Sequence, residues 1–211
     1  LLLADEINRT SSKTQSALLE AMEERQVTVD GVTRPLNSPF IVLATQNPIG
    51  SAGTQMLPSA QLDRFLMRLS MGYPDRSSQI EIMRDRHHEN PLDKITAVMD
   101  IPMLNQMIDE VTHVHVEDAI YDYISDIVEA TRENPFIQLG ISPRGALAIC
   151  RTAKACAYLH GRDYVIPDDV AEVLPDVGAH RLVLSPKAKL HEYTDRQLLL
   201  DILKEIKKHD V

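Results

Sequence analysis

Leu1-Leu2-Leu3-Ala4-Asp5-Glu6 is the stretch that decides the fold. Its four apolar residues are too few to cross a membrane, and we expect them to form a β-strand buried on both faces. Open α/β sheets place ligands at the carboxyl ends of their strands, and adjacent carboxylates there suit magnesium binding and water activation. We therefore predict an α/β fold with a candidate site at Asp5 and Glu6. A solvated turn is the alternative interpretation of this acidic pair.

A second apolar run, from Phe40 to Thr45, ends at Gln46-Asn47-Pro48 and is also typical of a central strand. If the two strands are neighbours, Asn47 lies beside Asp5 at one edge of the sheet. An amide at that edge can hydrogen-bond both a phosphate oxygen and an attacking water. Taken alone, an asparagine before a proline is usually a turn residue.

The composition limits the class of protein. With 211 residues, 44% of them apolar, the chain can form one large domain or two smaller ones. A formal net charge of −9 argues against a general affinity for nucleic acid or anionic lipid. Cys150 and Cys156 are expected to be reduced core residues of a cytoplasmic protein. The 211 residues show no signal peptide and no apolar run of membrane-spanning length.

The pattern changes near Tyr73-Pro74, so we predict a partial α/β core over 1–74 and a helical domain over 75–211. In the first part we expect a helix over 12–25, capped by Ser12, and a hairpin over 26–34 that turns at Asp30-Gly31. A loop over 50–58 and a short helix over 59–68 follow. In the second part we expect helices over 77–88, 104–111, 120–131, 143–161 and 194–209.

Two arginines are candidates for phosphate binding. Arg64 lies between Leu62 and Phe65, where it either pairs with Asp63 at the surface or meets a phosphate on a neighbouring subunit. Arg144 lies in the first turn of its predicted helix, where a cation opposes the helix dipole, and a bound phosphate would explain its presence.

Two histidine pairs invite a metal interpretation, namely His87-His88 and His113-Val114-His115. No Cys/His spacing of a structural zinc site accompanies them, and two ligands are too few. We therefore expect surface or hydrogen-bonded histidines.

Several blocks together resemble the MoxR family of AAA+ ATPases, in the family's order and spacing from Leu1 to about Ser185. The blocks are LLADEINR (2–9), QSALLEAMEERQV (15–27), LATQNP (43–48), AQLDRF (60–65), GISPRG (140–145) and GRDYVIPDDV (161–170). The acidic pair alone is weak evidence, whereas ordered blocks over this length are specific.

The resemblance implies a P-loop AAA+ core followed by an all-α helical lid, with ATP and Mg2+ as cofactors. Asp5 falls on the magnesium aspartate of the Walker B pair and Glu6 on its water-activating glutamate. Asn47 falls on sensor 1, Arg64 on the arginine finger and Arg144 on sensor 2, acting in cis or in trans. The hairpin from Gln26 resembles the insertion that precedes sensor 1 in one AAA+ clade.

The resemblance also implies partners. An arginine finger acts on a neighbour's ATP, which makes a ring-forming homo-oligomer, most naturally a hexamer, the working unit. Members of the family act as chaperone-like remodelling factors, commonly with von Willebrand factor A-domain proteins.

The chain departs from the family pattern in two ways. Its 211 residues contain no G-x-x-x-x-G-K-[ST] phosphate loop, so we expect these residues alone to bind no significant ATP. Gly50, Gln55 and Ser59 stand where the family commonly has Glu, an aromatic residue and Glu. Two alternatives stay open: a non-enzymatic helical interaction module, and a DNA-acting motor. The second is weakened because Arg34 is the only basic residue between Gln26 and Leu36.

Overall fold

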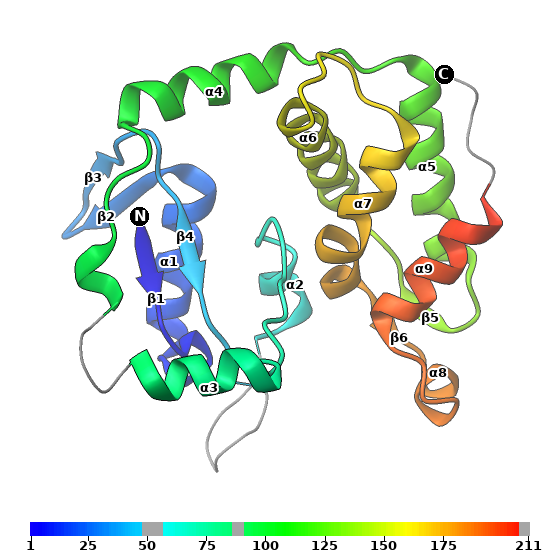
Figure 1. The fold of residues 1–211 in the computed structure, drawn as a ribbon. Coiled ribbons are helices and arrows are strands. Elements are labelled where there is room, and N and C mark those ends of the chain that lie inside the picture. Colours follow the sequence, from blue (N-terminus) through cyan, green and yellow to red (C-terminus); the bar gives the residue numbers. More distant parts are fainter. Residues whose placement is uncertain (48–56, 86–90, 207–211) are drawn as a thin grey trace.

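The computed structural model describes residues 1–47, 57–85 and 91–206. Figure 1 shows a small α/β part, which contains both strands of the opening sheet, beside a larger cluster of helices, with one long helix running across the top. Most of the loop predicted over 50–58, including Gly50 and Gln55, lies outside the described residues. The pair His87-His88 lies outside them as well.

The two apolar runs form strands, as the sequence predicts, and the structure pairs them as parallel neighbours. Strand β1 (Leu2–Ala4) pairs with β4 (Val42–Ala44), and Ala4 lies opposite Ala44. Backbone hydrogen bonds continue past both strand ends, from Thr45 N to Ala4 O at 3.0 Å and from Ile7 N to Thr45 O at 3.1 Å. The register therefore sets Asp5 next to Thr45.

The expectation that β1 is buried on both faces is wrong for this chain. Leu2 is 41% exposed, Leu3 64% and Leu43 on the paired strand 52%. Within the described part of the chain this sheet has two strands, so large parts of their apolar faces have nothing packed on them.

Helix α1 (Ser12–Glu24) is capped by Ser11 and not by the predicted Ser12, since the Ser11 side chain accepts the Thr14 N–H. The helix ends at Arg25, which adopts a left-handed conformation (φ 51°). The hairpin of β2 (Gln26–Val29) and β3 (Val32–Pro35) is confirmed, and both turn residues, Asp30 and Gly31, have the positive φ that a tight two-residue turn requires.

The short helix predicted over residues 59–68 is only one turn long, α2 (Ser59–Leu62). Arg64 therefore lies beyond its end. The carbonyls of Asp63, Phe65 and Leu66 accept hydrogen bonds from Arg181, in a distant part of the chain, and not from residues four positions later. Tertiary contacts thus replace the helical ladder here.

Helices α3 (Arg76–Asp85) and α4 (Ile101–His113) follow, and a short turn, η2 (Pro91–Lys94), lies in the described stretch between them. Asp100 caps α4 through the Met103 N–H. The apolar stripe of α4 is only partly buried, and Ile108 is 45% exposed, which is more than its spacing suggests.

The remaining elements form the helical cluster. The predicted helices are present as α5 (Asp118–Glu133), α6 (Pro143–Leu159), capped by Ser142, and α9 (Asp195–Glu205), with its Thr194–Gln197 capping box. Within this cluster the sequence analysis missed five elements, namely β5 (Ile137–Leu139), α7 (Pro167–Gly178), η3 (Ala179–Arg181), β6 (Val183–Leu184) and α8 (Pro186–Leu190). Strands β5 and β6 pair in antiparallel fashion.

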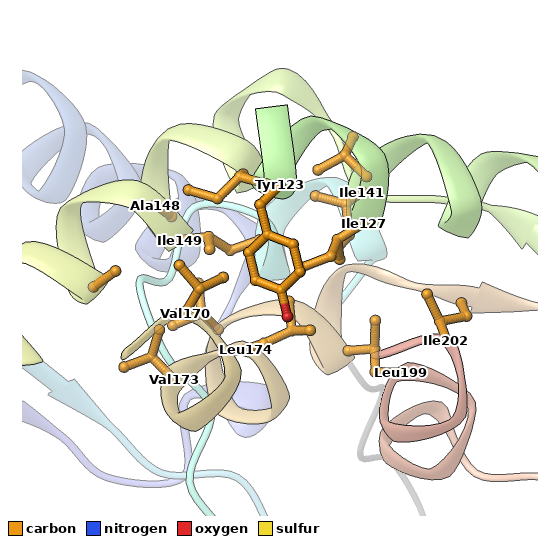
Figure 2. Close-up of a cluster of buried hydrophobic side chains, with 14 of the residues drawn as sticks. Tyr123, Ile127, Ile141, Ala148, Ile149, Val170, Val173, Leu174, Leu199 and Ile202 are labelled. Atoms are coloured by element: carbon orange, nitrogen blue, oxygen red, sulfur yellow. The ribbon is translucent and has the colours of Figure 1, made fainter. Parts of the chain in front are cut away.

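The main hydrophobic core lies inside this helical cluster and is formed by residues between Val114 and Ile202. Figure 2 shows the ring of Tyr123, which is fully buried, surrounded by apolar side chains of α6, α7 and α9. In the helices that the structure describes, none is both long and apolar enough to span a membrane.

Leu199 and Leu200 are neighbours on α9, with exposed fractions of 0% and 37%. Because truncating Leu199 leaves a cavity, we expect Leu199→Ala to lower the free energy of unfolding by roughly 2–5 kcal/mol. Leu200→Ala serves as the matched control and should cost less than about 1 kcal/mol. Urea denaturation followed by circular dichroism measures both, and equal losses would contradict the described core.

Candidate active site

Asp5 and Glu6 occupy the carboxyl end of β1, where Thr45 holds both residues. Thr45 Oγ1 donates a hydrogen bond to Asp5 Oδ1 at 2.6 Å and accepts one from the Glu6 backbone N–H at 2.8 Å. One hydroxyl thus joins the acidic pair to the neighbouring strand. Thr45 was the residue of this edge that the sequence analysis did not single out, although it ends the second apolar run.

Glu6 leaves the strand with φ 46°, a left-handed conformation that is uncommon for a residue with a side chain. Its carboxylate pairs with Arg9 Nη1 at 2.9 Å, and a short turn, η1 (Ile7–Arg9), follows. The turn of the backbone at Glu6 ends the alternation of the strand. Asp5 and Glu6 are therefore not constrained to opposite faces of the sheet.

Asn47 lies two residues beyond Thr45 and is exposed. Because β1 and β4 are parallel, Asn47 and Asp5 both come after the carboxyl ends of their strands, at the same edge of the sheet. The structure thus brings three of the predicted site residues, Asp5, Glu6 and Asn47, to one edge.

The donor set at this edge fits magnesium that is bound largely through water and phosphate oxygens. Asp5 is exposed, and within the described residues no hydrogen bond reaches its Oδ2 atom. Mg2+ keeps several water ligands and commonly takes one or two carboxylates together with substrate phosphate. Asp5 can supply one such carboxylate, while Thr45 fixes its orientation.

The two candidate arginines meet at a different place, on the carboxylate of Glu23. Arg64 Nη1 lies 3.0 Å from Glu23 Oε2, and Arg144 Nη2 pairs with Glu23 Oε1. Arg64 therefore does not pair with Asp63, which was its alternative interpretation. Glu23, in the last turn of α1, was not a candidate in the sequence analysis, because no local pattern distinguishes it from Glu24.

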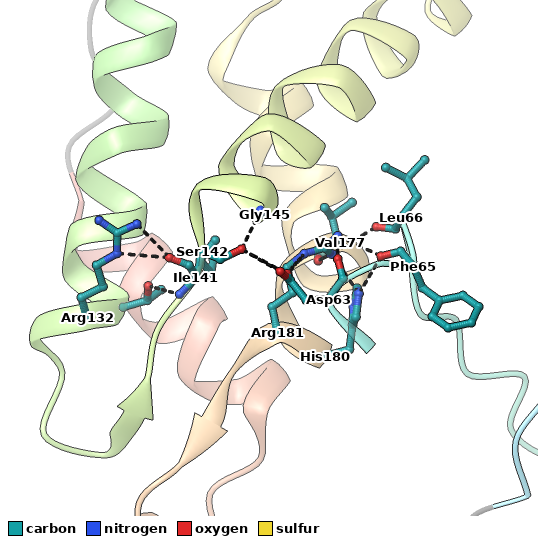
Figure 3. A network of polar contacts seen from close by, with 11 residues as sticks. Asp63, Phe65, Leu66, Arg132, Ile141, Ser142, Gly145, Val177, His180 and Arg181 are labelled. Carbon is teal, nitrogen blue, oxygen red and sulfur yellow. Dashed lines mark hydrogen bonds and ion pairs between the residues drawn. The ribbon is translucent and has the colours of Figure 1, made fainter. Parts of the chain in front are cut away.

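Asp63 instead links the helical cluster to the segment that contains Arg64, as Figure 3 shows. Ser142 Oγ, which caps α6, donates to both Asp63 oxygens at 3.1 and 3.0 Å, and Arg181 Nε lies 3.0 Å from Asp63 Oδ1. Arg181 is 4% exposed and also donates to the carbonyls of Phe65 and Leu66, at 2.8 and 3.2 Å.

Burial lowers the pKa of Arg181. The Asp63 carboxylate acts in the opposite direction and raises this pKa, whereas the charge of Arg144 lowers it further. Next to it, burial and then the Arg181 charge lower the pKa of His180 to about 4. His180 is therefore neutral at pH 7, and its Nε2 lies 3.1 Å from Phe65 O and 2.9 Å from Arg181 Nη1. Both side chains thus hold the backbone that follows Arg64.

Cys156, His160 and Asp169 are the one group in the described ranges whose ligand atoms lie within 4.8 Å of one another. Arg162 donates to both Asp169 oxygens, at 2.7 and 2.5 Å, and Asp169 also accepts the Ile166 N–H. Burial raises the pKa of Cys156 to about 11, so the thiol keeps its proton at neutral pH. An ion pair and a helix cap account for this group, and both cysteines are free thiols.

The pair His113 and His115 makes local contacts. His113 Nδ1 lies 2.9 Å from Asp109 O, and His115 Nε2 lies 2.9 Å from Glu117 Oε1. Neither belongs to the group described above.

Two family models match the chain. Residues 1–67 match the ATPase family associated with various cellular activities, AAA, and residues 129–202 match the AAA lid domain. These matches cover the sheet edge with its acidic pair and most of the helical cluster.

Two curated relatives and one crystal structure identify the protein family. The chain is 47% identical over 98% of its length to the uncharacterized protein YeaC of Bacillus subtilis, and 41% identical over 97% to the chaperone MoxR1 of Mycobacterium tuberculosis. A protein from Cytophaga hutchinsonii, described as a candidate ATPase, is 38% identical and superimposes with a TM-score of 0.91 over 99% of the chain. The chain spans 65%, 56% and 66% of the lengths of these three proteins. The chain belongs to the MoxR family of AAA+ ATPases.

The lowered pKa of His180 predicts a loss of stability in acid. Its pKa rises from about 4 in the folded protein to about 6.5 on unfolding, so the unfolded chain binds more protons between these values. Stability that is fully present above pH 6.5 is therefore lost as the pH falls toward 4. Between pH 7 and pH 5 we expect His180 to account for about 2 kcal/mol of the loss.

The measurement is the free energy of unfolding in urea at both pH values for the wild type and for His180→Gln, whose amide can donate to Phe65 O. The variant should lose less stability than the wild type over this interval. Equal losses would show that His180 is not a buried neutral group.

Proposed function

We propose that the longer protein to which these residues belong is a magnesium-dependent ATPase that hydrolyses ATP to ADP and phosphate. The observation that carries the proposal is the parallel β1–β4 pairing, which sets Asp5 and Glu6 beside Thr45 at the edge where open α/β sheets bind ligands. The family membership supports the same activity.

Each residue at the edge has a proposed task. Bound magnesium would neutralise charge on the triphosphate, and Asp5 would hold it through water. Glu6 would orient the attacking water and accept its proton, and Asn47 would hydrogen-bond that water or the terminal phosphate. The Glu6 carboxylate is held by Arg9, whose Nη1 lies 2.9 Å from Glu6 Oε2.

The phosphate loop must come from outside these residues, because the 211-residue sequence contains no G-x-x-x-x-G-K-[ST] motif. Most phosphate contacts of such ATPases belong to that loop. We therefore propose that the 211 residues alone neither bind ATP significantly nor turn it over.

Arg64 is proposed to serve as an arginine finger and Arg144 as a second phosphate-binding arginine, in a ring-forming homo-oligomer. Its proposed hexameric state rests on the resemblance to other AAA+ rings. We further propose division into a partial core over 1–74 and a lid over 75–211, and a cytoplasmic, chaperone-like remodelling role. A von Willebrand factor A-domain protein is the partner class that the family resemblance suggests.

The test is Glu6→Gln in the full-length protein. We expect ATP affinity to stay within about threefold, because binding rests on the phosphate loop, while kcat falls at least about 100-fold through loss of the base. Steady-state phosphate release and equilibrium nucleotide binding measure the two effects. Glu129→Gln, on the exposed face of α5, is the matched control. Unchanged turnover in Glu6→Gln would exclude Glu6 as the group that activates water.

A further inference from the structure

Glu23 is the one residue that forms ion pairs with both candidate arginines among the residues that the structure describes. Each of its two carboxylate oxygens takes one guanidinium group, Oε2 that of Arg64 at 3.0 Å and Oε1 that of Arg144. Arg64 follows α2 and Arg144 lies in the first turn of α6, so the carboxylate joins two segments that are distant in the sequence.

The residues that precede the two arginines are joined through their side chains as well. Asp63 precedes Arg64 directly, Ser142 stands two residues before Arg144, and the Ser142 hydroxyl donates to both Asp63 oxygens. Arg181 pairs with the same Asp63 carboxylate from within the helical cluster. Arg64 and Arg144 are therefore held as one unit in two ways: Asp63 links the segments in which they lie, and Glu23 binds their guanidinium groups.

This unit lies at the end of α1 that is remote from the acidic edge. Gln15, near the start of α1, donates to Ile7 O just past the acidic pair, at 3.2 Å. Glu23 follows eight residues later, which corresponds to about 12 Å along a helix axis. The two arginines and the acidic pair thus occupy opposite ends of one helix.

The charges favour an anionic ligand for the arginine unit. Two carboxylates, Glu23 and Asp63, face three guanidinium groups, which leaves a net positive charge. The side chains of Arg64 and Arg144 are 38% and 45% exposed. A guanidinium group carries five N–H donors, and Glu23 can engage only a few of them, so both groups can still bind a polyanion.

We propose that Glu23 is a positioning residue that holds Arg64 and Arg144 together as a paired binding unit for the triphosphate on a second copy of this chain. The proposal rests on the ATPase activity proposed above. Without Glu23 the two like charges repel, and neither arginine keeps the orientation that a phosphoryl group in transit requires.

The first experiment tests the contact in the 211-residue chain, without nucleotide. The Nε–Hε NMR signals of Arg64 and Arg144 are recorded for the wild type, Glu23→Gln and Glu24→Gln. Glu24 is the neighbouring exposed carboxylate, and its side chain makes no hydrogen bond or ion pair within the described structure. Both arginine signals should shift in Glu23→Gln and neither in Glu24→Gln. A shift of only one signal, or of none, would overturn the shared contact.

The second experiment measures ATP turnover by the full-length protein. We expect Glu23→Gln to lower kcat about 100-fold while KM for ATP stays within about threefold, and Glu24→Gln to match the wild type. Mixing Glu23→Gln subunits with Glu6→Gln subunits should restore turnover, because the second variant supplies intact arginines to the first. A general structural defect would not be rescued in this way.

The outcomes separate the two proposals. Equal kcat for Glu23→Gln and Glu24→Gln, or a low kcat that mixing does not restore, would overturn the positioning role and leave the ATPase assignment standing. A wild-type protein that binds ATP without turning it over would overturn the proposed function and the positioning role with it.

Discussion

The pairing of two short parallel strands is the constraint on which the candidate site depends. Ala4 lies opposite Ala44, and the hydrogen bonds that join Thr45 to Ala4 and Ile7 continue this register past the strand ends. A shift by one residue would turn the side chains of the strand to the other face and separate Asp5 from the Thr45 hydroxyl. The acidic pair is thus positioned by backbone hydrogen bonds, and its chemistry follows from the register.

A second set of contacts positions the basic residues independently of this sheet. Buried Arg181 binds the carbonyls that follow Arg64, and Asp63 links the same segment to the start of α6. A buried guanidinium group without its carboxylate would be costly, so this connection is strongly specified. The chain therefore carries acidic groups at one end of α1 and basic groups at the other. Such a division suits an ATP site shared between two subunits.

Local patterns in the sequence were sufficient for part of this picture. The apolar runs predicted strands at β1 and β4, and Asp30-Gly31 predicted the hairpin, because strand composition and turn chemistry are local properties. The sequence left open whether the two strands pair, and the structure shows that they do. The contacts of Thr45, Glu23 and Arg181 could not be predicted in this way, since each joins residues distant in sequence. Tertiary contacts also shortened α2 against its local pattern. Helix α7 was missed because Pro175 interrupts its pattern.

The most direct test of the central claim is a measurement of scalar couplings across hydrogen bonds in the 211-residue chain by NMR. The account predicts cross-peaks between Ile7 N and the Thr45 carbonyl carbon and between Thr45 N and the Ala4 carbonyl carbon, since these bonds measure 3.1 and 3.0 Å. Absence of both cross-peaks, with rapid exchange of these two amides with solvent, would show that the strands do not pair in this register. The acidic pair would then have no defined place at the edge of the sheet.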